Sequence, residues 1–236
     1  MVSRCSVATG SVTITGLPLL RLLQLVSPSL PVGGFTYSQG LEWAVEAGWV
    51  RDADAFCAWQ RAQIDDTLTH LDWPLLARLY HASLNHDQDA FAAWSRYLIA
   101  SRETAELRLE EQQRGHAFAR LLDGWALADW ETWRDNAALT QVGGMAWLAT
   151  RWGIPLHELA LGYGFMWLEG AVMAGVKLVP FGQQRAQTLL RDLSTTLPTA
   201  LDHALTLTDD ELGSSLPLVA IASACHETQY TRLFRS

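Results

Sequence analysis

The sequence predicts an all-α fold, a single-domain bundle of roughly ten helices joined by short connections. Apolar residues recur at helical spacing in almost every segment, and alternating runs of β-branched residues are nearly absent. No stretch rich in Gly, Ser or Pro divides the 236 residues, and no internal repeat is visible. Hydrophobic residues make up 49% of the chain, which is enough for a substantial core.

The first half of the chain contains clear helix starts and stops. An apolar stripe that stops before Pro28 predicts a first helix, and its members are Leu19, Leu22, Leu23 and Val26. Asp52 and Asp54 form an acidic start that favours a helix N-terminus, and one apolar face follows: Cys57, Ile64, Leu68 and Leu71. Asp72, followed by Pro74 in the first turn, predicts the start of another helix.

The second half is divided in the same way. A polar break at residues 85–87 precedes a helix marked by Phe91, Trp94 and Leu98. Glycine pairs and Gly-x-Pro signals then separate the segments, and Pro155 is placed to begin a long apolar helix that ends at Pro180–Gly182. Glu169 and Lys177 interrupt its most apolar part, which leaves pieces shorter than the roughly 20 residues of a membrane span. We therefore expect a buried central helix.

Composition excludes several classes of function. The net charge of −8 disfavours binding to nucleic acid or to anionic membranes. Three cysteines without a Cys-x-x-Cys pair suit a reducing compartment, so we expect a cytoplasmic protein. Residues 1–16 contain one arginine and no sustained apolar run, which predicts a flexible N-terminal tail rather than a signal peptide.

The segment Pro31-Val-Gly-Gly-Phe35 contains a glycine pair that could cradle a phosphate. The Gly-x-x-x-x-Gly-Lys-Ser/Thr pattern is absent, however, and no lysine lies nearby. A sharp turn between two helices is favoured, with Ser38 capping the second helix and Glu42 in its opening turns. The alternative is that Phe35, Thr36 and Tyr37 face a partner.

The segment Ser101–Gly115 is densely charged. Glu110 with Arg114, and Arg102 with Glu106, are spaced four apart as helical ion pairs, so a solvated helix face with Ser101 as its cap is expected. A docking surface is the runner-up, and an acid/base pair or a metal site would be further uses of such carboxylates.

Catalytic and metal-binding signatures are absent from the sequence. The seven histidines show no His-x-x-x-His spacing, and adjacent Cys225 and His226 diverge on a helix, so we expect no metal site. No Gly-x-Ser-x-Gly elbow or activated nucleophile is recognisable, and the tryptophans fit a core or a partner contact. We expect no catalytic residue and no cofactor.

The C-terminal tail, residues 226–236, contains a possible anchor. Tyr230, Leu233 and Phe234 have the i, i+3, i+4 spacing of a helical turn that fits a groove. Arg232 and Arg235 could add charge-assisted bonds to an acidic rim. The alternative is a terminal helix that folds back on its own body.

Four segments together carry a resemblance to a known family, and they are Leu30–Glu42, Arg102–Thr104, Ala171–Gln183 and His226–Ser236. In this order they resemble the UreF family of urease accessory proteins, from about Leu19 to the last residue. Thr36 stands where serine is expected, and Cys225 stands where a basic residue is usual.

The resemblance implies a non-enzymatic scaffold that assembles with UreD (also called UreH) and the GTPase UreG on apo-urease. It implies that GTP hydrolysis is coupled to nickel insertion, and that the chain forms a homodimer through helical surfaces. The alternative is a GTPase-activating protein that acts directly on UreG, with Arg102 as the first candidate for an arginine finger.

The resemblance also suggests a division of the chain and a set of partner-binding residues. We expect a flexible tail at 1–16, an all-helical UreF-like domain at 17–225 and a C-terminal partner-binding tail at 226–236. The expected partner-binding residues lie in the matched segments and are Gly33, Gly34, Phe35, Tyr37, Glu42, Arg102, Glu103, Lys177, Gln183, His226, Glu227, Tyr230, Arg232, Leu233 and Phe234.

Overall fold

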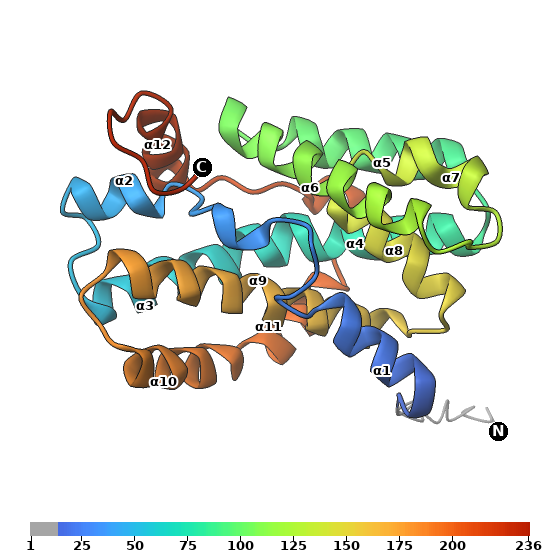
Figure 1. Cartoon of the computed structure of the whole chain (residues 1–236), viewed down its shortest axis with the longest axis horizontal. Coiled ribbons are helices and arrows are strands. Elements are labelled where there is room, and N and C mark those ends of the chain that lie inside the picture. Colours follow the sequence, from blue (N-terminus) through green and yellow to red (C-terminus); the bar gives the residue numbers. More distant parts are fainter. Residues whose placement is uncertain (1–13) are drawn as a thin grey trace, which may run out of the picture.

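A computed structural model describes residues 14–236, and over this range the protein is helical without a β-strand (Figure 1). The all-α prediction is confirmed. The α-helices are α1 (Gly16–Leu25), α2 (Leu41–Glu46), α3 (Ala53–Gln63), α4 (Trp73–Leu84), α5 (Gln88–Ala100), α6 (Ala105–Asp123), α7 (Trp130–Ala137), α8 (Gln141–Arg151), α9 (Leu156–Leu178), α10 (Gln183–Ser194), α11 (Leu197–Ala204) and α12 (Pro217–His226). Three further segments are η1 (Gly34–Thr36), η2 (Ile64–Asp72) and η3 (Asp209–Glu211). The expected flexible tail at 1–16 falls mostly outside the described residues.

Short polar side chains begin several helices, as their sequence positions predict. Asp52 Oδ1 accepts hydrogen bonds from the backbone N–H groups of Asp54 (3.0 Å) and Ala55 (2.9 Å), which satisfies two donors at the start of α3. Asp87 caps α5 in the same way. The acidic helix start at Asp52 is therefore confirmed.

The helix predicted to start at Asp72–Pro74 is continuous with the one before it. α3 passes into η2, a π-helical segment, and η2 passes into α4 without a break in the helical backbone. Within η2 the Thr69 hydroxyl donates to the Ile64 carbonyl at 2.7 Å. The widened turn precedes Pro74, whose ring would otherwise meet the carbonyl of the residue four back. This explains why the proline does not end the helix.

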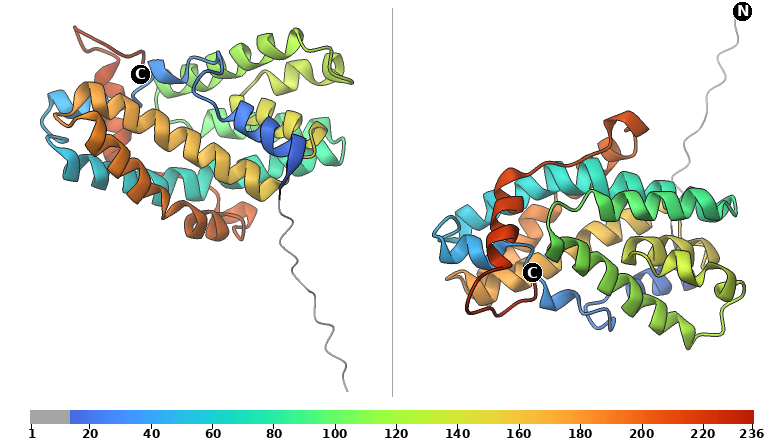
Figure 2. Two further views of the ribbon diagram at one scale, coloured as in Figure 1. Left: turned by 60° about the horizontal axis from the view of Figure 1, so that its bottom comes forward. Right: turned by 90° about the horizontal axis from the view of Figure 1, so that it is seen from above.

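The long apolar helix α9 runs through the middle of the bundle, between α4 on one side and α10 and α11 on the other (Figures 1 and 2). Pro155 precedes it and Pro180 follows it, as predicted. By length and composition α9 could cross a membrane, but half of its most apolar 18-residue window is buried inside the protein. The interpretation as a central core helix is supported.

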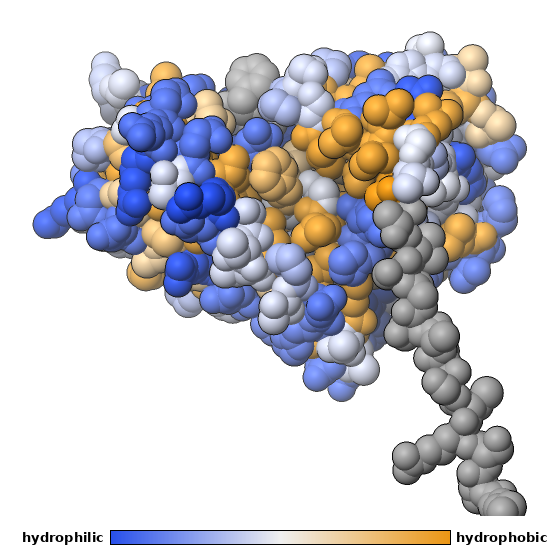
Figure 3. Space-filling view, turned by 90° about the horizontal axis from the view of Figure 1, so that it is seen from below, coloured by the Kyte–Doolittle hydropathy of each residue, from blue (hydrophilic) through white to orange (hydrophobic). Residues whose placement is uncertain are grey.

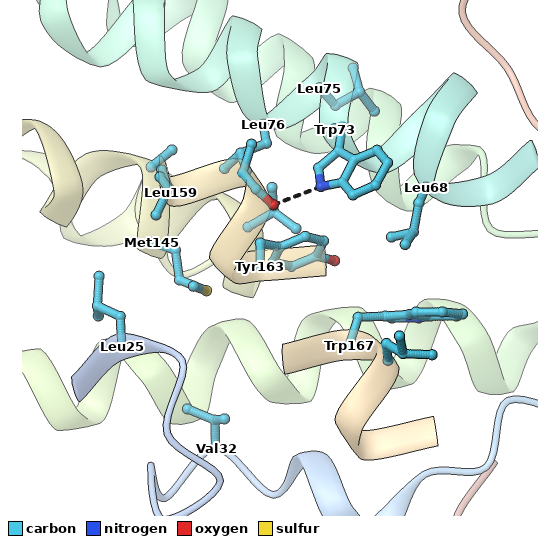
Figure 4. Packing of buried hydrophobic residues seen from close by; sticks show 14 of the residues in the cluster. Leu25, Val32, Leu68, Trp73, Leu75, Leu76, Met145, Leu159, Tyr163 and Trp167 are labelled. Carbon is cyan, nitrogen blue, oxygen red and sulfur yellow. Dashed lines mark hydrogen bonds between the residues drawn. The ribbon is translucent and has the colours of Figure 1, made fainter. Parts of the chain in front are cut away.

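The close approach of α9 and α4 depends on a small residue and one polar contact. Trp73 is completely buried, and its indole N–H donates to the Ala160 carbonyl of α9 at 2.7 Å (Figure 4). A Cβ atom on Gly164 would lie 2.4 Å from the Trp73 ring. The glycine therefore makes room for the tryptophan that joins the two helices.

A second close approach, between α6 and the α7–α8 connection, can be tested with a matched pair of helical glycines. In α6 a Cβ atom on Gly115 would lie 2.5 Å from the Ala138 carbonyl oxygen and 2.7 Å from the Thr140 nitrogen, whereas a Cβ atom on Gly170 in α9 would meet nothing within 4 Å. Gly115→Ala should lower the free energy of unfolding by about 1–3 kcal/mol, because the backbone must shift. Gly170→Ala should leave it unchanged or raise it by up to about 1 kcal/mol.

Denaturant unfolding followed by circular dichroism measures both variants. Equal stability of Gly115→Ala and the unmodified protein would contradict the described contact between α6 and the α7–α8 connection.

Candidate functional site

The C-terminal tail is not helical beyond its first residue, since α12 ends at His226 and residues 227–236 form turns, bends and irregular chain. The prediction of a helical anchor turn is therefore wrong. Phe234 is only 5% exposed and packs in the protein's own core, whereas Leu233 is 64% exposed and Tyr230 is fully exposed. The tail returns beside α2, where the C-terminus lies in Figures 1 and 2.

Glu42 is the main attachment point of the tail. This residue lies in the first turn of α2 and is 8% exposed. Its Oε1 accepts the backbone N–H of Leu233 at 2.6 Å, and its Oε2 accepts the backbone N–H of Phe234 at 2.9 Å. Charge-assisted bonds of this kind are stronger than those between neutral groups, so one carboxylate fixes the backbone of two consecutive tail residues.

His226 extends this arrangement to α6. Its Nε2 lies 3.2 Å from Glu42 Oε2, and its Nδ1 lies 2.7 Å from Glu106 Oε2. The other Glu106 oxygen accepts from Arg232 Nη1 at 2.7 Å. We call these four residues the C-terminal clasp. Arg232 is thus committed to the protein's own Glu106, which corrects the expectation that it is free for a partner's acidic rim.

The end of the tail is held by the segment before α2. The Ser236 carbonyl accepts from the backbone N–H of Ser38 (2.5 Å) and of Gln39 (3.0 Å), and also from the Ser38 hydroxyl. The Ser236 hydroxyl donates to Glu110 Oε2 at 3.0 Å, and the Arg235 N–H donates to the Thr36 carbonyl at 2.8 Å. The two most distinctive segments of the sequence are therefore partners in one structure.

The front segment adopts the predicted turn. Gly33 has a left-handed φ of +75°, and the Thr36 hydroxyl donates to its carbonyl at 2.8 Å. Gly34 begins η1 and is partly exposed, the Tyr37 hydroxyl donates to Gln113 Oε1 at 2.9 Å, and the Phe35 side chain is outside the described residues. The N-cap of α2 is Gly40 rather than Ser38, although the Ser38 hydroxyl accepts the Glu42 N–H at 3.3 Å.

The charged segment after Ser101 forms a buried ion cluster rather than a solvated face. Arg102 Nη2 lies 2.8 Å from Asp72 Oδ1 and 2.9 Å from Glu111 Oε2, and the Tyr163 hydroxyl donates to Asp72 Oδ2 at 3.3 Å. The expected pairing of Arg102 with Glu106 is wrong, because the Arg102 guanidinium instead binds Asp72 and Glu111 in the protein interior. The second expected pair, Glu110 with Arg114, is present at 3.0 Å.

Two more sequence interpretations of this segment need correction. Ser101 is the C-cap of α5, and the N-cap of α6 is Thr104, whose hydroxyl accepts the Leu107 N–H at 3.2 Å. Glu110 and Glu111 are buried: Glu110 binds Ser236 of the C-terminal tail, and Glu111 binds Arg102. A pattern of opposite charges at helical spacing does not distinguish these two situations.

Burial and neighbouring charges together set the pKa values in this cluster. Desolvation raises the pKa of Asp72 above its ordinary value, and Arg102 only partly offsets the effect. Burial also raises the pKa of Tyr163 well above its ordinary value, with a further contribution from the charge of Asp72. For Arg102, burial would lower the pKa, but Asp72 and Glu111 more than reverse this.

The other expected site residues are spread over the surface. Glu227 Oε1 accepts the N–H groups of Ala105 (3.0 Å) and Glu106 (3.3 Å), so it helps to cap α6. The Lys177 amine lies 5.2 Å from the centre of the Phe234 ring, on the tail. Glu103 and Gln183 are exposed, and no contact brings Gln183, at the start of α10, to the clasp.

Sequence reasoning missed several members of the site, namely Ser38, Asp72, Glu106, Tyr163 and Ser236. Only Glu106 had a usable signal, since it shares a helical face with Glu110. A pocket of about 110 Å³ is lined by Ser38 and Glu110, which bind Ser236, and by Tyr37, Gln39, Arg114 and Met166 among others. Among residues 14–236, no three His, Cys, Asp or Glu side chains are grouped so that they could hold a metal ion.

The fold and the site define a class of protein. It is an all-helical protein whose buried charged side chains form ion pairs and hydrogen bonds with other parts of the same chain. Comparison with known proteins then gives the family. The UreF family model matches residues 50–194. A urease accessory protein UreF of Pseudomonas putida is 73% identical over 220 residues, covering 93% of this chain and 98% of that protein. The UreF of Citrobacter koseri is 57% identical and that of Klebsiella pneumoniae 55% identical, each over 92% of this chain and 97% of the relative. The chain belongs to the UreF family of urease accessory proteins.

The buried ion cluster predicts how the loss of Arg102 changes the free energy of unfolding, and how this change depends on pH. Arg102→Met should lower the free energy of unfolding at neutral pH by about 3–5 kcal/mol, because Asp72 and Glu111 would remain buried without a cation. The pKa of Asp72, already raised by burial, should rise further, so the folded state would bind a proton that the unfolded state releases. The loss should therefore be complete above the raised pKa and shrink as the pH falls toward the ordinary value.

Denaturant unfolding at neutral and mildly acidic pH measures this effect. Arg134→Met is the matched control, since Arg134 pairs with Asp123 at 2.8 Å on the surface and should change little. A loss for Arg102→Met that is small, or that grows in acid, would contradict the described cluster.

Proposed function

We propose that this chain is a non-catalytic scaffold of urease maturation, which assembles with UreD (UreH) and the GTPase UreG on apo-urease. In this assembly it couples GTP hydrolysis to nickel insertion into the urease active site. Its membership of the UreF family supports a role beside urease. The structural observation that carries the proposal is the clasp, which holds a C-terminal segment in place while two of its large apolar side chains face solvent.

The terminal region is the proposed UreD-binding surface. Tyr230 and Leu233 project from the clasped tail, and Leu218 and Ile221 are exposed one turn apart on α12. Exposed apolar groups of this size commonly mark protein–protein contacts. Because Glu42 binds the backbone N–H groups of Leu233 and Phe234, and Glu106 binds the side chain of Arg232, less conformational entropy is lost on binding than for a free tail.

A second apolar surface is formed by the exposed side of α1. Leu17, Leu19, Leu20 and Leu23 are all exposed on this helix, and Figure 3 shows the apolar patch beside the point where the described chain begins. This surface is available for a further contact in the assembly, such as the expected homodimer or UreG.

The alternative function, direct activation of UreG by an arginine finger, receives no help from Arg102. Its guanidinium is held by Asp72 and Glu111 in the interior, so it cannot reach a phosphoryl group on another protein without breaking both ion pairs.

An arginine finger raises the turnover of a GTPase by about 10³–10⁵-fold. GTP hydrolysis by UreG, measured with and without the chain and UreD, should change far less than this. Acceleration into that range would favour the alternative.

The UreD surface is tested by the double variant Tyr230→Ala/Leu233→Asp. We expect affinity for purified UreD to fall by at least about tenfold, because the two exposed apolar contacts are lost, while the helical content stays unchanged. Leu84→Asp is the control, since Leu84 is 48% exposed at the C-terminal end of α4, at the far end of the bundle from α12 (Figure 1).

Size exclusion and calorimetry measure the complex. Unchanged UreD affinity in the double variant would remove the tail from this surface, and no co-elution of the unmodified chain with UreD would contradict the scaffold role itself.

A further inference from the structure

We propose that the C-terminal clasp is a protonation-dependent latch, in which His226 as a doubly protonated cation bridges Glu42 and Glu106, and a rise in pH loosens the tail. This inference concerns the chain alone and does not depend on any partner.

The first step is the hydrogen bonding of the ring. The His226 side chain is 0% exposed, and both of its nitrogens lie within hydrogen-bond distance of a carboxylate oxygen, at 2.7 Å from Glu106 and 3.2 Å from Glu42. An ionised carboxylate only accepts hydrogen bonds. Both bonds therefore exist together only when each ring nitrogen carries a proton, which makes the ring a cation.

The charges around the ring agree with this state. From α2 it faces Glu42, with Glu46 held nearby by Gln229, and from α6 it faces Glu106. From the tail, Arg232 neutralises only one side of Glu106, while Glu227 is turned to the start of α6. Other charges at the tail are more distant in the network: Glu110 binds Ser236, and Lys177 lies over Phe234.

The helix ends contribute in the same direction. His226 is the last residue of α12, where the carbonyl dipoles favour a cation, and Glu106 lies in the first turn of α6, where the N–H dipoles favour an anion. The cationic ring therefore balances the buried carboxylate of Glu42, which has no other positively charged partner among residues 14–236.

Loss of one proton from the His226 ring weakens mainly its contact with Glu42. The bond from Nδ1 to Glu106 is the shorter of the two, so the remaining proton stays there, and the Nε2 lone pair then faces Glu42 Oε2. Glu42 is nearly buried and cannot replace this donor with water at low cost. The same carboxylate oxygen holds the Phe234 N–H. Repulsion at this oxygen consequently weakens the attachment of the tail.

Amide hydrogen exchange of the C-terminal peptide, followed by mass spectrometry, measures the latch directly. Protection of the Leu233 and Phe234 amides is taken relative to an unstructured peptide of the same sequence, which removes the intrinsic effect of pH on exchange. Between about pH 6 and about pH 9, protection should fall by at least about tenfold. Protection that does not change over this range would overturn the proposal.

Two variants separate the latch from general loosening. His226→Gln cannot gain a charge, so its tail protection should be low and independent of pH, whereas the exposed His116→Gln should behave like the unmodified chain. Glu106→Gln leaves one carboxylate, to which a neutral ring can donate from Nε2, so this variant should keep its protection at high pH.

Circular dichroism establishes that each variant is folded. Should His226→Gln fail to fold, Glu106→Gln decides the matter. A fall in protection for Glu106→Gln as steep as that of the unmodified chain would overturn the proposal, as would a pH-dependent His226→Gln.

Discussion

The contact on which the candidate site depends is the Glu42 carboxylate with the backbone N–H groups of Leu233 and Phe234. It joins a residue at the start of α2 to the end of the chain, and it does so where water is nearly excluded. With this contact made, Phe234 fills a place in the core and the neighbouring Leu233 must face outward. Without it, the last five residues would retain the polar contacts of Arg232, Arg235 and Ser236. The position of Leu233 in the proposed binding surface therefore depends on the buried carboxylate of Glu42.

Buried charge recurs throughout this part of the molecule. α6 supplies Glu106 to the clasp, Glu110 to Ser236 and Glu111 to Arg102, so one helix serves two ion networks. Such groups lose much hydration energy when they are buried, and an apolar replacement would often be as stable. What they provide instead is a defined geometry, since each carboxylate accepts bonds only from particular donors. The proposed scaffold role requires a surface that is defined in this way.

The helical class, the acidic helix start at Asp52, the turn at Gly33 and the central apolar helix could be predicted from local patterns, because each depends on residues close in sequence. The clasp and the attachment of Ser236 could not, because they join residues far apart in the sequence: 184 positions separate Glu42 from His226, and 198 separate Ser38 from Ser236. Helical spacing suggested that Arg102 pairs with Glu106, but the fold offered Asp72 from another helix, and burial rather than spacing selected the partner. The tail misled for a related reason: the i, i+3, i+4 pattern of Tyr230, Leu233 and Phe234 fits a helix, yet the N–H groups of Leu233 and Phe234 bond to Glu42 rather than to their own segment.

The central claim is that Glu42 holds the end of this chain in place, and carboxypeptidase digestion of the chain ending at Ser236 tests it most directly. Ser236 is buried in the folded protein, so the unmodified chain should resist trimming. Glu42→Gln should be trimmed at least about tenfold faster, because an amide replaces one of the two oxygens that accept the tail N–H groups. Glu46→Gln, which touches the tail only through Gln229, should resemble the unmodified chain. Equal trimming rates for Glu42→Gln and the unmodified protein would contradict the account.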